Sequence, residues 1–367
     1  MSADAIRVLV VDDSVAVRRA LGDALEREPG FVVCGSAPNG LLALELAARS
    51  RPDVIVLDLE MPVMDGLEFL SRLRPEYPKL PVVVFSGVVG HANEATLEAM
   101  WRGASDYVLK PHGSSPERTA EFLRAELFPR LRALASSGSS IPRNGSAAMP
   151  RPSLAIPPAL LPLPAGPDPV PSVVVVGAST GGPRALAAAL GALPVDFPLP
   201  VVIVQHMPAE MSEFFAAGLG VNCELPVHLA TDGGSLTPGA LWVAAGGAHL
   251  TLVADGARAR FRFDHGPEIN GCRPAVDPLF LSATQVFGSG VLGIVLTGMG
   301  QDGLEGARAI AGAHGRVLVQ DETSSVVWGM PGAIARAGLA QAVLPLAGLG
   351  AEILARASRR APRRRAA

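Results

Sequence analysis

Three carboxylates and one lysine stand where hydrophobic segments end in the first third of the sequence. Asp12 and Asp13 follow the segment IRVLVV, Asp58 follows VIVL, and Lys110 follows DYVL. Carboxylates brought together repel one another unless a divalent cation neutralises them, and an oxygen-only ligand set suits Mg²⁺. A carboxylate there can attack phosphorus, while the metal and a lysine stabilise charge on the phosphoryl oxygens. The pattern therefore predicts a magnesium-dependent aspartyl-phosphate site at Asp58.

A serine in a glycine-rich turn offers a second kind of chemistry. Ser179 lies in GASTG, between the hydrophobic run VVVV and a helical pattern. The G-x-S-x-G spacing is that of a nucleophile elbow, which exposes the hydroxyl near free helix N–H groups. A serine in such a turn can equally be a helix cap or part of a phosphate-binding loop. The turn continues as GPR, without the lysine of a nucleotide-binding loop, and this disfavours nucleotide binding.

A serine nucleophile needs a base and an acid that orients the base. His206 follows the next hydrophobic segment, VVIVQ, and Asp302 lies in TGMGQDG after GVLGIVL. Neighbouring parallel strands bring such residues to one rim of a sheet, where they can form a Ser-His-Asp triad. Taken alone, a histidine such as His206 is usually structural, and Asp302 could as well cap the following helix as serve as the acid. The order Ser, His, Asp differs from that of α/β-hydrolases and argues against an ordinary lipase or esterase.

The elements that position the first group alternate between strand and helix. The strand patterns are IRVLVV, FVVCGSA, VIVLDL, VVVFSG and DYVLKP, and helices are expected over 15–28, 41–49, 67–73, 92–100 and 117–135. This alternation implies a parallel sheet with right-handed crossovers. Five strands and five helices predict a flavodoxin-like α/β fold, in which ligands bind beyond the carboxyl ends of the strands.

The second half of the chain repeats this style. Its strand patterns are VVVVGAS, VVIVQHM, GVLGIVLTG and GRVLVQD, and helices are expected over 184–193, 212–219, 278–287, 303–313 and 331–337. The segment from GALWV to RARFRF has a hairpin-like pattern. We therefore expect a second doubly wound α/β domain with an antiparallel β insertion.

A proline-rich segment divides the two halves. Residues 136–171 hold ten prolines and no aromatic residue, so this segment cannot build a core and is expected to be a semi-extended linker. The expected organisation is a first domain over 1–125, a helix end and linker over 126–171, a second domain over 172–355 and a basic tail over 356–367.

Composition narrows the class of protein. The 367-residue chain has a formal net charge of −3, and each predicted domain is acidic, which argues against a nucleic-acid-binding module. Three cysteines without a C-x-x-C pair fit a reducing compartment, and the N-terminus lacks the pattern of an export signal. No apolar window is long enough for a membrane span. A cytoplasmic protein without direct membrane insertion is expected.

The first domain resembles the response-regulator receiver domain. VLVVDDS, VIVLDLEMPVMDGLEFL, VVVFSG and DYVLKP occur in the order of that family, and Lys110 is one of only two lysines in the chain. The resemblance implies that Asp58 is the phosphoacceptor and that Lys110 contacts the phosphate, with a candidate cis bond to the next proline. The Mg²⁺ ligands implied are Asp12, Asp13, Asp58 and the Glu60 carbonyl, and the implied switch residues are Ser86 and Tyr107.

The second domain resembles the chemotaxis protein-glutamate methylesterase family, CheB. The segments GASTGGPRAL, VIVQHMP, DGGSLTPGALWVAAGGAHL, CRPAVDPLF, VLTGMGQDG and QDETSSVVWGMPGAI follow the order of that family. The resemblance implies hydrolysis of glutamyl γ-methyl esters on methyl-accepting chemotaxis receptors, and deamidation of receptor glutamines. Ser179 would attack, His206 would relay the proton, Asp302 would orient His206, and N–H groups near Met299 and Gly300 would bind the oxyanion.

The resemblance also implies a regulated enzyme. A histidine kinase of the CheA type would phosphorylate Asp58, and the unphosphorylated receiver domain would cover the catalytic cleft. The hydrolysis itself needs no cofactor in this interpretation. The alternative is a non-enzymatic protein on the same fold, whose interactions depend on phosphorylation.

Overall fold

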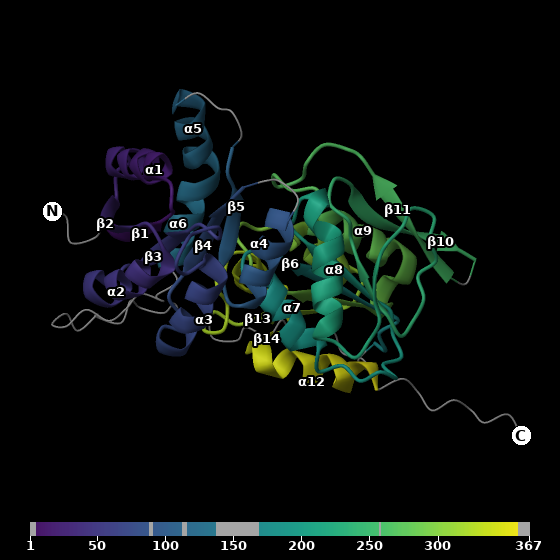
Figure 1. The fold of residues 1–367 in the computed structure, drawn as a ribbon. Helices are drawn as coiled ribbons and strands as arrows, with labels where there is room; N and C mark the ends of the chain where they lie inside the picture. Colours follow the sequence, from purple (N-terminus) through teal and green to yellow (C-terminus); the bar gives the residue numbers. More distant parts are fainter. Residues whose placement is uncertain (1–4, 88–90, 112–115, 137–168, 257, 359–367) are drawn as a thin grey trace, which may run out of the picture. The chain divides into compact units, whose positions relative to one another are not determined.

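The computed structural model describes residues 5–87, 91–111, 116–136, 169–256 and 258–358. The chain divides into two compact units, Met1–Arg151 and Pro152–Ala367. Most of the proline-rich linker and the arginine-rich end of the tail lie outside the described residues, so those two predictions stay untested. Figure 1 shows the elements of both units along the chain.

The first unit holds a five-stranded parallel sheet in the order β2-β1-β3-β4-β5. Its strands are β1 (Ile6–Val11), β2 (Phe31–Ala37), β3 (Val54–Leu57), β4 (Val82–Ser86) and β5 (Asp106–Leu109). This order is that of the flavodoxin-like fold, which confirms the prediction from the alternating pattern. Because β3 and β4 are buried along their whole length, both faces of the sheet must be covered.

Helices pack on both faces of this sheet. They are α1 (Val15–Arg27), α2 (Gly40–Ser50), α3 (Gly66–Glu76), α4 (His91–Trp101), α5 (Pro116–Phe122) and α6 (Phe128–Ser136), the last two joined by a π-helical turn η1 (Leu123–Leu127). Side chains of β1, β3 and β4 form one buried cluster with α2, α3 and α4. Side-chain caps begin three of the helices: Ser14 accepts from Val17 N, Asn39 from Leu42 N and Asp65 from Glu68 N.

The second unit holds a seven-stranded parallel sheet in the order β14-β13-β12-β6-β7-β9-β8. Its strands are β6 (Val173–Ala178), β7 (Val201–Gln205), β8 (Val227–Leu229), β9 (Leu241–Val243), β12 (Val291–Val295), β13 (Arg316–Gln320) and β14 (Ala342–Leu344). The strand β6 is buried throughout and lies between β12 and β7. The predicted doubly wound α/β architecture is therefore confirmed.

The helices of the second unit form two groups, and contacts between helices join the members of each group. The first group is α7 (Gly182–Leu190), α8 (Ser212–Val221) and α12 (Leu346–Ala357), and the second is α9 (Val276–Phe287), α10 (Leu304–Gly312) and α11 (Met330–Arg336). Two short 3₁₀ turns, η2 (Ala209–Met211) and η3 (Gly288–Gly290), precede α8 and follow α9. Val173 and Val175 of β6 join the buried cluster of the second group, as alternation along a strand requires.

The antiparallel insertion is a hairpin of β10 (His249–Asp255) and β11 (Arg258–Asp264). It packs against α9, where Leu252 N donates to Ser282 Oγ at 3.0 Å. The sequence grouped LWV with this hairpin, but the structure places it as β9 in the parallel sheet, paired with β7 and β8. The prediction of an insertion was right, and its extent was too long.

Three further features bear on the site predictions. Among the described residues the cis peptide bond is Arg273–Pro274, so the cis form suggested for Lys110–Pro111 was wrong.

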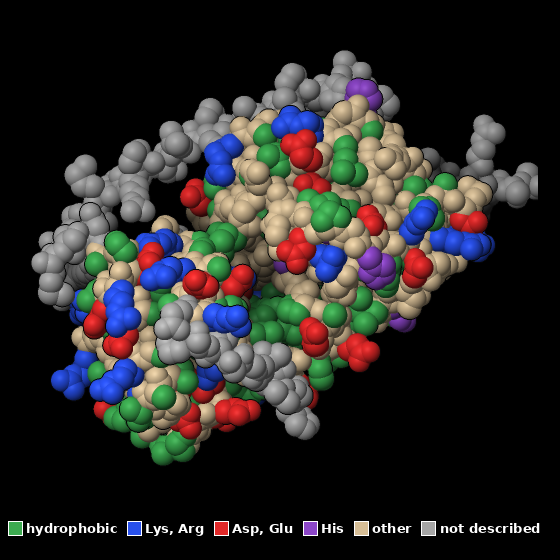
Figure 2. All heavy atoms as spheres, turned by 90° about the horizontal axis from the view of Figure 1, so that it is seen from above, with side chains coloured by type: hydrophobic (Ala, Val, Ile, Leu, Met, Phe, Trp, Pro, Cys, Tyr) green, Lys and Arg blue, Asp and Glu red, His purple; other side chains and the backbone are tan. Residues whose placement is uncertain are grey.

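None of the described helices combines the length and apolar character needed to cross a membrane. On the face drawn in Figure 2, acidic and basic side chains are interspersed over the surface.

Candidate functional site

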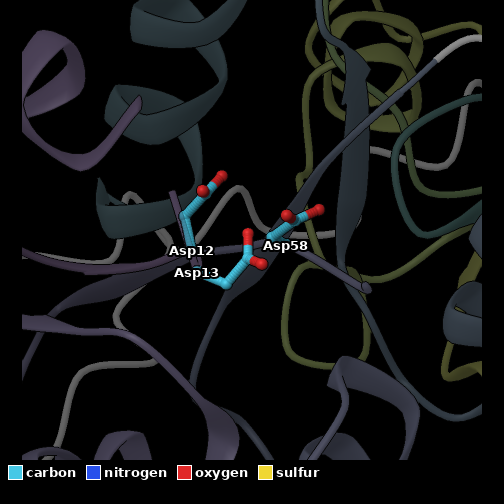
Figure 3. Close-up of side chains that lie close together, drawn as sticks. All are labelled: Asp12, Asp13 and Asp58. Atoms are coloured by element: carbon cyan, nitrogen blue, oxygen red, sulfur yellow. The ribbon is translucent and has the colours of Figure 1, made fainter. Parts of the chain in front are cut away.

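The carboxylates of Asp12, Asp13 and Asp58 meet at the carboxyl ends of two adjacent strands. Asp12 and Asp13 follow β1, Asp58 follows β3, and one carboxylate oxygen from each lies within 4.8 Å of the others. Figure 3 shows the three side chains at this edge of the sheet. Asp12 and Asp58 are buried and Asp13 is exposed, which leaves the cluster open on one side. We call these residues, with Lys110, the Asp58 site.

Lys110 is the cation that faces this cluster. It follows β5, and its Nζ lies 2.8 Å from Asp12 Oδ2 and 2.9 Å from Asp58 Oδ2. Burial, with the nearby charge of Asp12, raises the pKa of Asp58 although Lys110 opposes that shift. Burial also disfavours the charged lysine, but its bonds to the two carboxylates raise the pKa of Lys110. Lys110 therefore places its positive charge against two of the three carboxylates, those of Asp12 and Asp58.

The remaining predicted receiver residues lie on the strands β4 and β5 and in the loop after β3. Ser86 ends β4 and is buried, and its carbonyl accepts from Lys110 N at 2.7 Å. Tyr107 lies half-buried in β5 and packs against the core of the sheet. Glu60 is exposed and lines the same open pocket as Asp13.

A glycine explains how the backbone around Asp58 closes. Gly66 begins α3, and its N–H donates to the carbonyl of Leu59 at 3.0 Å. A Cβ at this position would lie 2.5 Å from the Asp58 carbonyl oxygen and 2.8 Å from Leu59 Cα. The start of α3 thus approaches the chain beside Asp58 more closely than a side chain would allow.

The second predicted site begins at the turn after β6. Ser179 is half-buried, and its N–H donates to the Thr297 carbonyl at 3.1 Å while its own carbonyl accepts from Gly182 N at 2.7 Å. Gly181 has a φ of 76°, a conformation that favours glycine. A Cβ on Gly298 would lie 2.9 Å from Ser179 Cβ, so glycine there lets the loop after β12 approach the serine.

His206 and Asp302 come together across the sheet. His206 follows β7 and Asp302 lies in the loop between β12 and α10, while Ser179 follows β6 between those two strands. His206 Nε2 lies 2.8 Å from Asp302 Oδ2. We call Ser179, His206 and Asp302 the Ser179 site. Three adjacent parallel strands supply it, as the sequence predicted for a single rim of the sheet.

The carboxylate of Asp302 is held by several donors besides His206. Oδ2 accepts from Val276 N at 2.6 Å, and Oδ1 accepts from Asp277 N at 3.2 Å and from Gly303 N at 3.0 Å. Burial opposes the ionised form, but the bond to His206 and these N–H groups outweigh burial and lower the pKa of Asp302. Two of the donors are at the start of α9, where the helix dipole also favours a negative charge.

The other ring nitrogen of His206 faces a thiol. Cys272 Sγ lies 3.3 Å from His206 Nδ1, whereas the described residues include no hydrogen bond between the hydroxyl of Ser179 and His206. Burial lowers the pKa of His206, but the contacts with Asp302 and Cys272 outweigh it and raise the pKa to about 9. The structure thus brings His206 to Asp302 and leaves Ser179 without a direct bond to the imidazole.

The predicted oxyanion donors lie in the loop between β12 and Asp302. Met299 is half-buried and Gly300 is exposed, with a φ of 81° at the glycine. Within the described part of the chain, the N–H groups of these two residues donate no backbone hydrogen bond. Among these residues neither N–H group is held by a backbone carbonyl, and the oxyanion role of both stays a prediction.

Sequence reasoning missed three residues that contact the Ser179 site. Cys272 contacts His206, and the Asn270 Nδ2 donates to Asp302 Oδ1 at 3.2 Å. Asp277 is a second buried carboxylate beside Asp302. All three lie in or next to the segment CRPAVDPLF, which was noted only as a family pattern. The Asn-Gly pair and the acidic residue in the first turn of α9 were the available signals.

Comparison with known proteins agrees with this architecture. The CheB methylesterase family model matches residues 174–353, and the response regulator receiver domain model matches residues 8–119. A protein-glutamate methylesterase/protein-glutamine glutaminase of Trichodesmium erythraeum is 43% identical, covering 95% of this chain and 98% of the relative. A protein of the same name from a Nocardioides species is 45% identical, covering 97% of each chain.

A solved structure gives the same result for the second unit. The crystal structure of the Thermotoga maritima CheB methylesterase catalytic domain is 38% identical, with a TM-score of 0.50, and covers 50% of this chain and 98% of that one. With the Ser-His-Asp arrangement on one sheet edge and two full-length relatives above 40% identity, the chain belongs to the CheB methylesterase family and carries the response regulator receiver domain ahead of the methylesterase domain.

Proposed function

We propose that this protein is a phosphorylation-regulated hydrolase that removes methyl esters from glutamate side chains of chemoreceptors and deamidates specific receptor glutamines. The observation that carries the proposal is the 2.8 Å pairing of His206 with the buried Asp302 beside the turn of Ser179. Family membership supports the same activity, because the relatives are named for both reactions. The substrate class follows from those names.

The proposed reaction starts with attack by Ser179 Oγ on the γ-carbonyl carbon. Because Nε2 of His206 is paired with Asp302, the Ser179 proton passes to Nδ1, where Ser179 takes the place of Cys272. The N–H groups of Met299 and Gly300 stabilise the oxyanion. His206 then returns the proton to the leaving methoxide or amide, and methanol or ammonia departs. Water attacks the acyl-enzyme in the same way and releases glutamate.

Asp302 serves to orient and stabilise the protonated imidazole. Its other bonds come from three backbone N–H groups, so its position does not depend on His206 alone. A carboxylate with a lowered pKa stays ionised while His206 takes up the proton. This arrangement supports an acyl-transfer role for the Ser179 site.

The receiver domain is proposed to be phosphorylated at Asp58. The convergence of Asp12, Asp13 and Asp58 oxygens fits Mg²⁺, with the Glu60 carbonyl as a further ligand. When bound, Mg²⁺ supplies charge neutralisation at the phosphoryl group. Lys110 already contacts Asp58 and would hold a phosphoryl oxygen. Ser86 and Tyr107 are proposed to report phosphorylation to the rest of the receiver domain.

The proposed partners follow from these two activities. A histidine kinase of the CheA type donates the phosphoryl group, and methyl-accepting chemotaxis receptors are the substrate. We place the protein in the cytoplasm, because three free cysteines fit a reducing compartment. The hydrolysis itself is proposed to need no cofactor.

The test is methanol release from methylated receptor fragments by the full chain. The assay is run with and without a small phosphodonor and Mg²⁺, and Ser179→Ala and Asp58→Asn serve as matched variants. Release that is accelerated by the phosphodonor is expected, with all release lost in Ser179→Ala and only the acceleration lost in Asp58→Asn. Phosphorylation without release from any methylated receptor would instead favour a phosphorylation-dependent interaction protein.

A further inference from the structure

A tight turn beside the Ser179 site contacts two of its members. Ile269 and Cys272 exchange backbone hydrogen bonds of 3.0 and 3.1 Å, and the two residues between them, Asn270 and Gly271, have φ values of 54° and 73°. Two successive positive φ values are typical of a type I′ turn, which favours Asn-Gly. The turn therefore has a sequence-determined conformation, which fixes the direction of the side chains on either side.

The turn reaches both the acid and the base of the site. Asn270 Nδ2 donates to Asp302 Oδ1 at 3.2 Å. Cys272 Sγ lies 3.3 Å from His206 Nδ1, on the opposite side of the ring from Asp302. One four-residue segment thus lies against His206 and Asp302 together.

Asn270 also contacts a second buried carboxylate. Its Nδ2 lies 3.4 Å from Asp277 Oδ2, so the amide bridges Asp277 and Asp302. Asp277 is 6% exposed, and its Oδ1 accepts from Gly306 N at 2.7 Å. The backbone N–H of Asp277 donates in turn to Asp302 Oδ1. Asp302 therefore caps the start of α9, the helix that contains Asp277. Asp277 in turn caps the start of α10, the helix that follows Asp302.

Two carboxylates at such close range influence one another electrostatically. Burial, together with the charges of Asp302 and Glu305, raises the pKa of Asp277 to about 6. Asp277 therefore becomes charged as the pH rises through about 6. From there upward Asp302, which is paired with His206, has a second buried negative charge beside it, so Asp277 can act on the imidazole only through Asp302.

The groups around this pair come from four elements. Asp302 belongs to the loop after β12, Glu305 and the Gly306 N–H to α10, and Asn270 to the turn. His249 of β10 lies at the same end of α9, where its Nδ1 accepts from Ala275 N at 3.1 Å. Among the described residues, the charged or titratable groups that face His206 itself are Asp302 and Cys272.

We propose that Asn270 and Asp277 are positioning residues of the Ser179 site. The Asn270 amide bridges the two carboxylates and fixes Asp302 against His206, while Asp277 supplies a second buried negative charge that sets the pH at which His206 becomes a base. This inference rests on the proposed function and extends it to residues outside the triad. It gives the Asn-Gly turn and the first acidic residue of α9 a role in the reaction.

The first experiment measures the pH profile of kcat/KM for Asp277→Asn in the full chain. Asparagine keeps the size of Asp277 and can still accept from Gly306 N, but it removes both the charge and the Oδ2 acceptor of Asn270 Nδ2. Asn270→Gly removes that same contact and keeps the charge of Asp277, so it is the control for the lost bond. Without that charge the imidazolium is less favoured, and the acidic limb should move to lower pH by at least about half a unit. Glu305→Gln removes an exposed carboxylate near Asp277 and should move the limb much less.

The second experiment tests the bridge with Asn270→Gly. Glycine accepts the positive φ of this position and removes only the amide, so the turn should keep its conformation. We expect kcat to fall about tenfold with KM within about twofold, because Asp302 loses a donor that orients it. Asn270→Asp replaces the amide donor by a third carboxylate beside Asp277 and Asp302, and its kcat should fall further.

The outcomes separate this inference from the proposed function. A purely structural role predicts a lower Tm and equal loss of activity at every pH, with no movement of the limb, and that result would overturn the inference. An inactive wild-type chain would overturn the proposed function. In that case NMR titration of the His206 ring, assigned with His206→Gln, still decides whether Asp277→Asn lowers the pKa of His206, and an unchanged pKa rejects the coupling.

Discussion

The Asp58 site and the Ser179 site are built on the same plan and differ in how their carboxylates are satisfied. Both lie beyond the carboxyl ends of parallel strands. At the first, Lys110 contacts two of the three carboxylates, those of Asp12 and Asp58. At the second, Asp302 accepts from three backbone N–H groups, an amide and His206. The first cluster is compatible with an added cation, whereas the carboxylate of Asp302 at the second already has its hydrogen-bond donors within the fold.

The two environments shift the carboxylate pKa values in opposite directions. Burial raises the pKa of Asp58, while the bond to His206 and the N–H groups lower the pKa of Asp302 in spite of burial. In its proposed role as the phosphoacceptor, Asp58 gains from having few hydrogen-bond donors of its own. A carboxylate that only orients a base gains from being fixed. The comparison suggests that each site can be disabled without the other.

The largest expected effect is that of Asp302→Asn on the proposed hydrolysis. The substitution keeps the size of the side chain but removes the charge that stabilises imidazolium and gives His206 Nε2 a different partner. We expect kcat to fall by about 10³–10⁴-fold, measured as methanol release. Phosphorylation of Asp58 by a small phosphodonor should be unchanged in the same preparation. A loss of both activities would mean that the two sites are not separable.

The second prediction concerns the pH dependence of the hydrolysis. In its proposed role as a base His206 must be neutral, and its contacts raise its pKa to about 9. The neutral fraction therefore grows as the pH rises toward that value, and kcat/KM should increase about tenfold per pH unit below it. The measurement is kcat/KM from pH 6 to 10 without phosphodonor. An acidic limb near the ordinary histidine value of about 6.5 would contradict the pairing seen here.

The positions of most chemical groups could be predicted because they follow strands with strong hydrophobic patterns. Asp58 directly follows β3, and His206 directly follows β7. Helix bounds were also close, as in α10, expected over 303–313 and found over Leu304–Gly312. The short strands β8 and β14 were missed, because three residues are too few for a periodic pattern. The helix α12 was missed as well, since its two glycines weaken the helical signal.

Side-chain contacts between segments far apart in the chain could not be predicted from the sequence. The Asn-Gly pair predicts a turn, yet its contact with Asp302 joins residues 32 positions apart and depends on how α9 and α10 pack. The same holds for Asp277 and Gly306, which are 29 positions apart. The roles assigned to the site residues and the first and last residue of each domain stay predictions.

The third prediction concerns the Mg²⁺ requirement of the Asp58 site, which the Ser179 site is not expected to share. Asp13 is the exposed member of the Asp58 site and has no bond to Lys110 among the described contacts. Asp13→Asn should therefore raise the Mg²⁺ concentration needed for half-maximal phosphorylation by about tenfold, since one charged ligand is lost. Basal methanol release should not change. Phosphorylation with an unaltered Mg²⁺ dependence would exclude Asp13 as a ligand.

The smallest expected effect is on stability and distinguishes the two units. In Gly66→Ala the new Cβ would lie 2.5 Å from the Asp58 carbonyl oxygen, and neither that backbone nor Leu59 Cα can move cheaply. Overpacking of this kind costs about 1–3 kcal/mol, which should lower the Tm of the receiver domain by about 5–10 °C. Gly22→Ala in α1, where a Cβ meets nothing within 4 Å, is the matched control and should leave that Tm unchanged or slightly higher.

Calorimetry of the full chain should show the loss in one transition only, because the Ser179 site has its own sheet and core. A shift of both transitions would show that the units unfold together, and the two sites would then share their stability while keeping separate chemistry.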